Sequence, residues 1–101
     1  MALDLSVSLD ESVVTIGITG PFDFRIHREF RDTLHRCMSP GRAYRVDLAG
    51  VDYLDSSALG MLLLLREHAG GDDARVALVG ARTEVRQILT IANFDKMFEI
   101  R

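Results

Sequence analysis

Apolar and polar residues alternate along three stretches of the chain, which is the pattern of β-strands. The alternation runs over 3–9, 13–18 and 44–48. Because successive side chains of a strand point to opposite faces, a period of two predicts strands with one buried face. Turn-forming residues between the first two strands favour an opening hairpin. A nearly continuous apolar segment at 75–80 and a last segment at 96–100 predict two further strands.

Between these strands the apolar spacing changes to three and four, which predicts amphipathic helices. The first helix begins near Asp23, the second directly after Asp55, and the third at the capping residue Thr83. Gly70 and Asn93 are typical of the ends of the second and third helices. The first helix has its apolar stripe at Ile26, Phe30, Thr33, Leu34 and Cys37. The order β-β-α-β-α-β-α-β indicates an α/β chain with a mixed central sheet and helices packed on it.

Length and charge limit what the chain can be. Its 101 residues have room for a single domain, over 1–101, with one modest hydrophobic core. The formal net charge is -3, and acidic and basic residues are interspersed, so we expect no basic surface that would attract nucleic acid. The histidines and Cys37 have no metal-ligand spacing, so we expect neither a metal nor a cofactor.

The chain has no visible targeting or membrane signal. Its longest apolar run, Met61–Leu65, is far shorter than the roughly 20 residues that a membrane span needs. The N-terminus lacks the basic start and apolar stretch of a signal peptide, and a lone Cys37 cannot form an internal disulfide. We therefore expect a cytoplasmic protein without direct membrane insertion.

An Asp-Ser-Ser step, Asp55-Ser56-Ser57, stands where a loop is expected to become the second helix. Asp55 or Ser56 can cap that helix by accepting a hydrogen bond from one of its free N–H groups, which stabilises by about 1 kcal/mol. A serine hydroxyl at a helix start is also a well-placed phosphoacceptor. The added dianion meets free N–H groups and the positive end of the helix dipole. Spacing alone favours the capping role, because capping serines greatly outnumber regulatory ones.

The same segment resembles the signature of STAS domains of anti-sigma factor antagonists. That signature is a strand ending in Asp-Leu, an aromatic and an apolar residue, and then Asp-Ser-Ser-Gly-Leu-Gly at a helix start. In this chain it reads Asp47-Leu48, Tyr53-Leu54 and Asp-Ser-Ser-Ala-Leu-Gly at 55–60. The resemblance extends to 20–23 at the start of the first helix and to 92–98 near the end, so it covers essentially the whole chain.

The resemblance implies a STAS fold and a role in partner switching rather than catalysis. In such proteins the first serine after the aspartate is phosphorylated, which corresponds to Ser56. Unphosphorylated, the protein binds an anti-sigma factor and so frees a sigma factor. Phosphorylation by a serine kinase blocks this binding, and a separate serine phosphatase restores it. Whether the anti-sigma factor is itself the kinase stays open. The free domain is expected to be a monomer or a weak dimer.

Residues around Ser56 are assigned supporting roles. Asp23 stands at the family's acidic position near the phosphorylation site, with a helix cap as the alternative interpretation, and Asp55 and Ser57 flank the acceptor. The second helix carries more apolar residues than one buried face requires, so part of it is expected to bind the partner. That surface is assigned to Ala58, Leu59, Met61 and Leu64. Ala58 departs from the family's usual glycine, an exchange that stabilises a right-handed helix by up to about 1 kcal/mol.

Other functional classes are weaker on the sequence. Ser56 lacks the Gly-x-Ser-x-Gly context of a hydrolase nucleophile, and neither a phosphate-binding glycine loop nor a kinase motif is present, so we expect no enzyme. The main alternative is a STAS-only accessory subunit, an adaptor in a membrane transport ATPase complex, which would share the fold. Co-purification separates the two functions, because one predicts transporter subunits and the other an anti-sigma factor.

Overall fold

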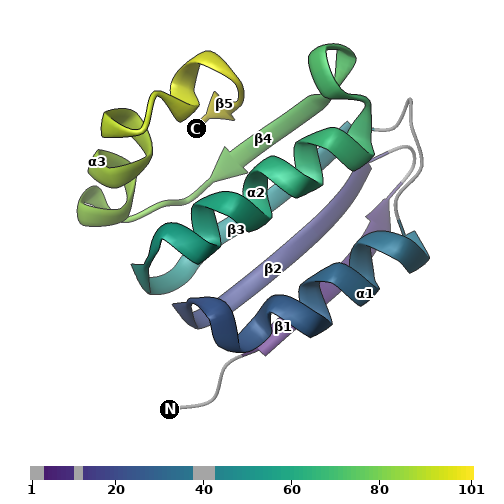
Figure 1. The fold of residues 1–101 in the computed structure, drawn as a ribbon, viewed down its shortest axis with the longest axis horizontal. Helices are drawn as coiled ribbons and strands as arrows, with labels where there is room; N and C mark the ends of the chain where they lie inside the picture. The colour runs from purple at the N-terminus through teal and green to yellow at the C-terminus, as the bar shows by residue number, and fades with distance from the viewer. Residues whose placement is uncertain (1–3, 11–12, 38–42) are drawn as a thin grey trace.

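The chain folds into a mixed five-stranded sheet with helices on one of its faces (Figure 1). This computed structural model describes residues 4–10, 13–37 and 43–101, and only the backbone of 4–10 and of Cys37. The strands are β1 (Asp4–Asp10), β2 (Val13–Phe22), β3 (Ala43–Leu54), β4 (Arg75–Val79) and β5 (Glu99–Ile100). The helices are α1 (His27–Cys37), α2 (Ser56–Ala69) and α3 (Thr83–Ile91), with short 3-10 turns η1 (Phe24–Ile26), η2 (Gly71–Asp73) and η3 (Phe94–Lys96). The predicted α/β class and order of strands and helices are confirmed.

The strands lie in the sheet in the order in which they follow along the chain. β1 pairs antiparallel with β2, as the predicted hairpin requires, although residues 11–12 at its turn lie outside the described residues. All other neighbours are parallel, and α1, α2 and α3 supply the crossovers that parallel pairs need. β2, β3 and β4 therefore end at one edge of the sheet, on the left in Figure 1. We call this the carboxyl edge, formed by Phe22, Leu54 and Val79.

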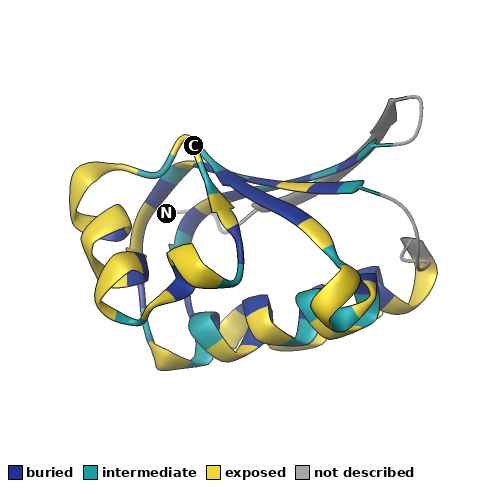
Figure 2. Ribbon diagram, turned by 90° about the horizontal axis from the view of Figure 1, so that it is seen from above, coloured by how far each residue is buried: buried dark blue, intermediate teal, exposed yellow. Residues whose placement is uncertain are grey.

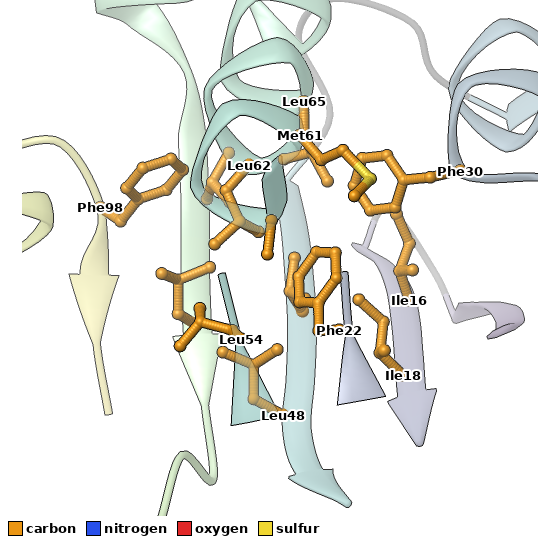
Figure 3. Packing of buried hydrophobic residues seen from close by; sticks show 14 of the residues in the cluster. Ile16, Ile18, Phe22, Phe30, Leu48, Leu54, Met61, Leu62, Leu65 and Phe98 are labelled. Atoms are coloured by element: carbon orange, nitrogen blue, oxygen red, sulfur yellow. The ribbon is translucent and has the colours of Figure 1, made fainter. Parts of the chain in front are cut away.

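Apolar side chains of the sheet and helices fill the space between the two layers (Figure 3). β2 sends Val14, Ile16 and Ile18 to the helix side, as its period of two predicts. The predicted stripe of the first helix is buried at Ile26, Phe30, Thr33 and Leu34, while the side chain of Cys37 lies outside the described residues. The opposite face of the sheet carries none of the described helices (Figure 2).

The strand β3 is longer than its alternating pattern predicts. Alternation ends near Leu48, and a loop was expected from there to the second helix, yet β3 continues to Leu54. Its pairing with β2 shifts register before Thr19 and again before Pro21, and then resumes with Phe22 opposite Leu54. Such irregularities break the strict period of two, so the strand continues beyond the residues that alternate between apolar and polar. The second helix therefore starts almost directly from the end of a sheet strand.

The C-terminal elements also differ in their boundaries. The rings of Phe94 and Phe98 stack with centroids 5.2 Å apart, and the N–H of Phe98 donates to the carbonyl of Phe94 at 2.8 Å. This turn replaces the start of the predicted last strand, so β5 is only Glu99–Ile100. Thr83 is the first residue of α3 rather than its cap, since the N-cap position is Arg82, which makes no capping bond with its side chain.

The helix α2 buries a wide arc of its surface because it lies over the sheet with α1 beside it (Figure 1). Its buried residues are Ala58, Met61, Leu62, Leu65 and Ala69. Met61 is 2% exposed and lies beside the ring of Phe30 in α1, and Ala58 is fully buried (Figure 3). The expectation that these two residues form partner surface is therefore wrong. Leu59 and Leu64, from the same expectation, are only partly buried.

Truncating α2 at an inner and at an outer position tests this orientation. We expect Met61→Ala to lower the free energy of unfolding by about 2–5 kcal/mol, because it leaves a cavity against α1 and the sheet. Leu63→Ala, at a side chain that is 38% exposed, should cost less than about 1 kcal/mol. Urea denaturation of the two variants and wild type gives both values. Equal losses would contradict the placement of Met61 in the core.

Candidate functional site

Two aspartates follow the paired ends of β2 and β3 at the carboxyl edge. Phe22 and Leu54 are partners in the parallel pairing, and the next residues are Asp23 and Asp55. The N–H of Asp55 donates to the carbonyl of Phe22 at 3.3 Å, which continues the ladder past the last pair. Asp23 then precedes η1 and α1, and Asp55 precedes α2. The sheet thus brings Asp23 beside the segment that carries Ser56, from a distant part of the sequence.

Asp55, and not Ser56, caps α2. The carboxylate of Asp55 accepts a hydrogen bond from the N–H of Ala58 at 3.0 Å, and the Asp55 backbone is extended. Such a cap typically stabilises a helix by about 1 kcal/mol relative to alanine. Ser56 is then the first helical residue with an exposed side chain, while Ser57 is half-buried. Within the described residues the Ser56 hydroxyl has no hydrogen-bond partner, so the fold does not depend on it.

Asp23 is a buried carboxylate whose charge is paired with Arg25. The residue is 7% exposed and caps η1, since its Oδ1 accepts from the backbone N–H of Arg25 at 3.0 Å. The guanidinium of Arg25 also donates through Nη2 to Oδ2 at 2.8 Å and through Nε to Oδ1 at 3.0 Å. The side-chain hydrogen bonds of Arg25, and then its backbone N–H, hold the pKa of the Asp23 carboxyl below its ordinary value of 3.8. Asp23 is therefore a helix cap as well as a neighbour of the segment that carries Ser56.

One exposed ridge of α2 extends from Ser56 along the helix. We call it the outer ridge, and it consists of Ser56, Gly60, Leu63 and Glu67, all of which are exposed. Their spacing of three and four puts them on one face of the helix. Leu59 and Leu64 lie beside this face and are partly buried. The ridge is the part of α2 that the sheet and α1 leave uncovered.

The outer ridge contains a glycine that the fold itself does not need. Gly60 lies inside α2, outside the positive-φ region, and a Cβ built on it would have no heavy atom within 4 Å. Glycine in a helix interior costs roughly 0.5–1 kcal/mol relative to alanine. No internal contact of the described residues offsets this cost. The motif that carries Ser56 includes Gly60, but sequence reasoning assigned it no role.

Two exposed aromatic residues lie at the carboxyl edge, close in sequence to Asp23 and Asp55. Phe24 directly follows Asp23 and is 68% exposed, and Tyr53 lies near the end of β3 and is 55% exposed. Sequence reasoning used Tyr53 only as a position of the motif and did not single out Phe24. Their positions in the sequence could have identified them, because each aromatic residue lies within two positions of a capping aspartate, Asp23 or Asp55. Large exposed aromatic side chains are common anchors of protein interfaces.

The surroundings of Ser56 are acidic and hold no arrangement for a metal. Asp52 is exposed close to Asp55, and the nearby cation Arg25 is held by Asp23. No cluster of three or more His, Cys, Asp or Glu side chains in the described ranges is placed to hold a metal ion. Among the described helices, none has the length and apolar character needed to cross a membrane.

Sequence comparison identifies the family. Residues 5–99 match the family model described as "Mlab, STAS domain". A STAS-domain containing protein of Pseudomonas aeruginosa (strain UCBPP-PA14) is 51% identical over 100 residues, which is 99% of each chain. The chain therefore belongs to the STAS domain family.

Solved structures with the same fold include a regulator and a transporter family protein. An anti-sigma factor antagonist from Mycobacterium paratuberculosis superposes with a TM-score of 0.83 at 22% identity, over 98% of this chain and 85% of that one. A sulfate transporter family protein from Wolinella succinogenes superposes with a TM-score of 0.74 at 16% identity, over 92% and 81%. At such identities the similarity establishes the fold, and it confirms the expected STAS fold.

Replacing Asp23 with asparagine tests the charge pairing, because asparagine keeps a capping oxygen. The pKa of Asp23 is lowered in the folded protein, so its ionised form stabilises the fold above the ordinary value of 3.8. This contribution is lost as the pH falls through the lowered pKa. We expect Asp23→Asn to be less stable than wild type at neutral pH and the difference to vanish in strong acid.

Urea denaturation of both proteins over a pH series measures this convergence. Arg25→Gln is the matched control, because it removes the other charge of the same pair and should converge with wild type in the same way. A stability difference that does not change with pH would show that Asp23 acts through its shape and not through its charge.

Proposed function

We propose that this protein is an anti-sigma factor antagonist whose binding state is set by phosphorylation of Ser56. Unphosphorylated, it binds an anti-sigma factor, which then releases its sigma factor. A serine kinase blocks this binding by modifying Ser56, and a separate serine phosphatase restores it. The protein is a substrate rather than an enzyme in this scheme and acts in the cytoplasm, as a monomer or a weak dimer. The observation that carries the proposal is the exposed Ser56 hydroxyl at the start of α2, where Asp55 alone provides the cap.

The position of Ser56 suits a reversible phosphoacceptor. Its side chain is exposed, so a kinase and a phosphatase can reach it, and no described contact is lost when it is modified. A phosphate there adds about −1.5 to −2 charges, and the positive end of the α2 dipole makes that charge locally tolerable. The fold should therefore survive phosphorylation while the surface beside Asp52 and Asp55 becomes strongly acidic.

The partner surface that we assign surrounds the same hydroxyl. It keeps Leu59 and Leu64 from the sequence-based expectation and replaces Ala58 and Met61 with exposed residues. The added residues are Gly60 and Leu63. A partner that covers this apolar surface must also cover Ser56. Removing a phosphate dianion from water against apolar groups is costly unless the partner supplies cations, so phosphorylation is expected to break the complex.

Mass spectrometry on protein from its native cells tests the phosphorylation site. We expect one phosphate on wild type, located on the peptide that contains Ser56 and absent from Ser56→Ala. Ser57→Ala is the matched control, because it removes the neighbouring hydroxyl and should keep the phosphate. Loss of the phosphate in Ser57→Ala but not in Ser56→Ala would contradict the assignment.

Pull-downs with the phosphomimetic variant test the effect on binding. We expect wild type and Ser56→Ala to recover an anti-sigma factor, and Ser56→Asp to bind it at least about tenfold more weakly, because an added charge must be desolvated. A titration of the purified partner against each variant gives the affinities. If Ser56→Asp bound as tightly as wild type, charge at this position would not control the complex.

Gly60→Ala separates stability from binding. Because a methyl group at Gly60 meets nothing in the folded protein, we expect the variant to be more stable than wild type by roughly 0.5–1 kcal/mol. The same methyl group projects from the outer ridge and should weaken the anti-sigma factor complex if the partner approaches the helix backbone closely. Thermal denaturation and a binding titration measure the two effects. A stabilised variant with unchanged affinity would exclude Gly60 from the partner surface.

The second candidate function is an adaptor subunit of a membrane transport ATPase complex. A sulfate transporter family protein shares the fold, and this similarity supports the adaptor function as an alternative. The adaptor function predicts that pull-downs recover transport subunits. Wild type, Ser56→Ala and Ser56→Asp should recover equal amounts of them. The favoured function predicts an anti-sigma factor whose recovery depends on the residue at position 56.

A further inference from the structure

The sheet face opposite the helices carries a cluster of arginines, far from the outer ridge of α2. In the parallel register Arg75 lies beside Ala43, and Arg45 lies beside Ala77. Tyr44 and Val76, which alternate with these residues, are buried on the helix side. Because successive side chains of a strand point to opposite faces, Arg45 and Arg75 project from the face opposite the described helices, which is the upper face of the sheet in Figure 2.

A third arginine completes the cluster from the neighbouring strand. Glu99 of β5 pairs with Ala77, and Arg101 is two residues further along. Arg101 continues the sheet ladder through its N–H, which donates to the carbonyl of Leu78 at 2.9 Å. Its guanidinium makes an ion pair with Glu99. Arg45 of β3, Arg75 of β4 and Arg101, directly after β5, therefore lie on one face of the sheet.

These residues surround a pocket of about 440 Å³. The small side chains of Ala43 and Ala77 lie in its lining next to the long arginines, which leaves room above the sheet. Val13 and Met97, both half-buried, add apolar surface to the lining. Pockets of roughly 300–1,000 Å³ with apolar walls and a few converging polar groups are typical of small-ligand sites.

The charge in this pocket is opposite in sign to that of the whole chain. Three guanidinium groups and the carboxylate of Glu99 line it, whereas the formal net charge of the chain is -3. Glu99 is paired with Arg101, and Arg45 has no ion-pair or hydrogen-bond partner within the described part of the chain. Asp47 is further along the same face and already accepts a hydrogen bond from the N–H of Ala49 at 3.0 Å. Among the described residues of the pocket, Arg45 is therefore a cation whose N–H donors are unused.

We propose that this pocket binds the phosphate group of a small organic phosphate. Guanidinium groups bind oxyanions through paired N–H donors. The charge of two guanidinium groups is matched by a phosphate dianion, whereas a single carboxylate neutralises only one of them. Arg45 and Arg75 hold the phosphate over the alanines, and Val13 and Met97 contact the organic part. The site lies on the opposite face of the sheet from Ser56, so it does not depend on the function proposed above.

Amide NMR titrations of the full chain with inorganic phosphate and with phenyl phosphate test the site. Both probes should give saturable shifts centred on residues 43–45, 75–77 and 99, and phenyl phosphate should bind more tightly because it also reaches Val13 and Met97. Arg45→Gln and Arg75→Gln should each lower the affinity by about tenfold, the size of a lost hydrogen bond to a charged group. Arg86→Gln is the matched control, because it removes one exposed arginine of α3 outside the pocket and should change nothing.

Three results would overturn the proposal. Shifts that never saturate, or that centre on other residues, would mean that phosphate does not occupy this pocket. Equal losses of affinity in Arg45→Gln and Arg86→Gln would show that phosphate affinity depends on the net charge of the protein and not on this pocket. Equal affinity for the two probes would remove the role of the apolar lining. The variants are compared only after their amide spectra show the wild-type fold, which exposed positions such as Arg45 should keep.

Discussion

The pairing of the last residues of β2 and β3 is the contact on which the rest of the site depends. Phe22 and Leu54 are opposite one another and buried, and the N–H of Asp55 adds one more bond, to the carbonyl of Phe22. Because each strand leads at once into a helical segment, this pairing fixes where both segments start. It brings Asp23 beside Asp55 and leaves Ser56 as the first residue of α2. A slip of one residue in β3 would turn Leu54 away from the core and move the serine with it.

The helix α2 has a buried side and an exposed side that differ in their contribution to the fold. The inner side, with Met61 and Leu62 fully buried, contributes to the core together with α1 and the sheet. The outer ridge has Gly60, which weakens the helix, and Leu63, which is left exposed where a stable fold alone would favour polar residues. Natural proteins often break local rules where they bind something. Ala58, where the family signature has glycine, falls on the inner side, so its methyl group is in the core.

Much of the fold could be predicted from local patterns, and the misses have physical causes. The alternation in β2 and the stripe of α1 are confirmed because one face of each is buried against the other layer. The end of β3 was missed because the register with β2 shifts twice, which a single strand's period cannot reveal. The start of β5 was missed because Phe94 and Phe98 stack on each other and hold a turn in place of a strand. The first boundary was decided by pairing with a distant strand, and the second by a local turn that the strand period does not describe.

The sequence by itself indicated the class of the fold, the family and Ser56 as the candidate phosphoacceptor, since these depend on period, turn residues and a local motif around Ser56. It also contained the capping chemistry, because an aspartate before a helix start caps it wherever the helix lies. Only the tertiary structure decided which apolar residues of α2 are hidden. A helix rich in leucine has no polar side to mark its orientation, so burial of Met61 and exposure of Leu63 depend on where α1 and the sheet lie. The same holds for Arg45, Arg75 and Arg101, whose meeting on one face depends on the register of three strands that local sequence does not encode.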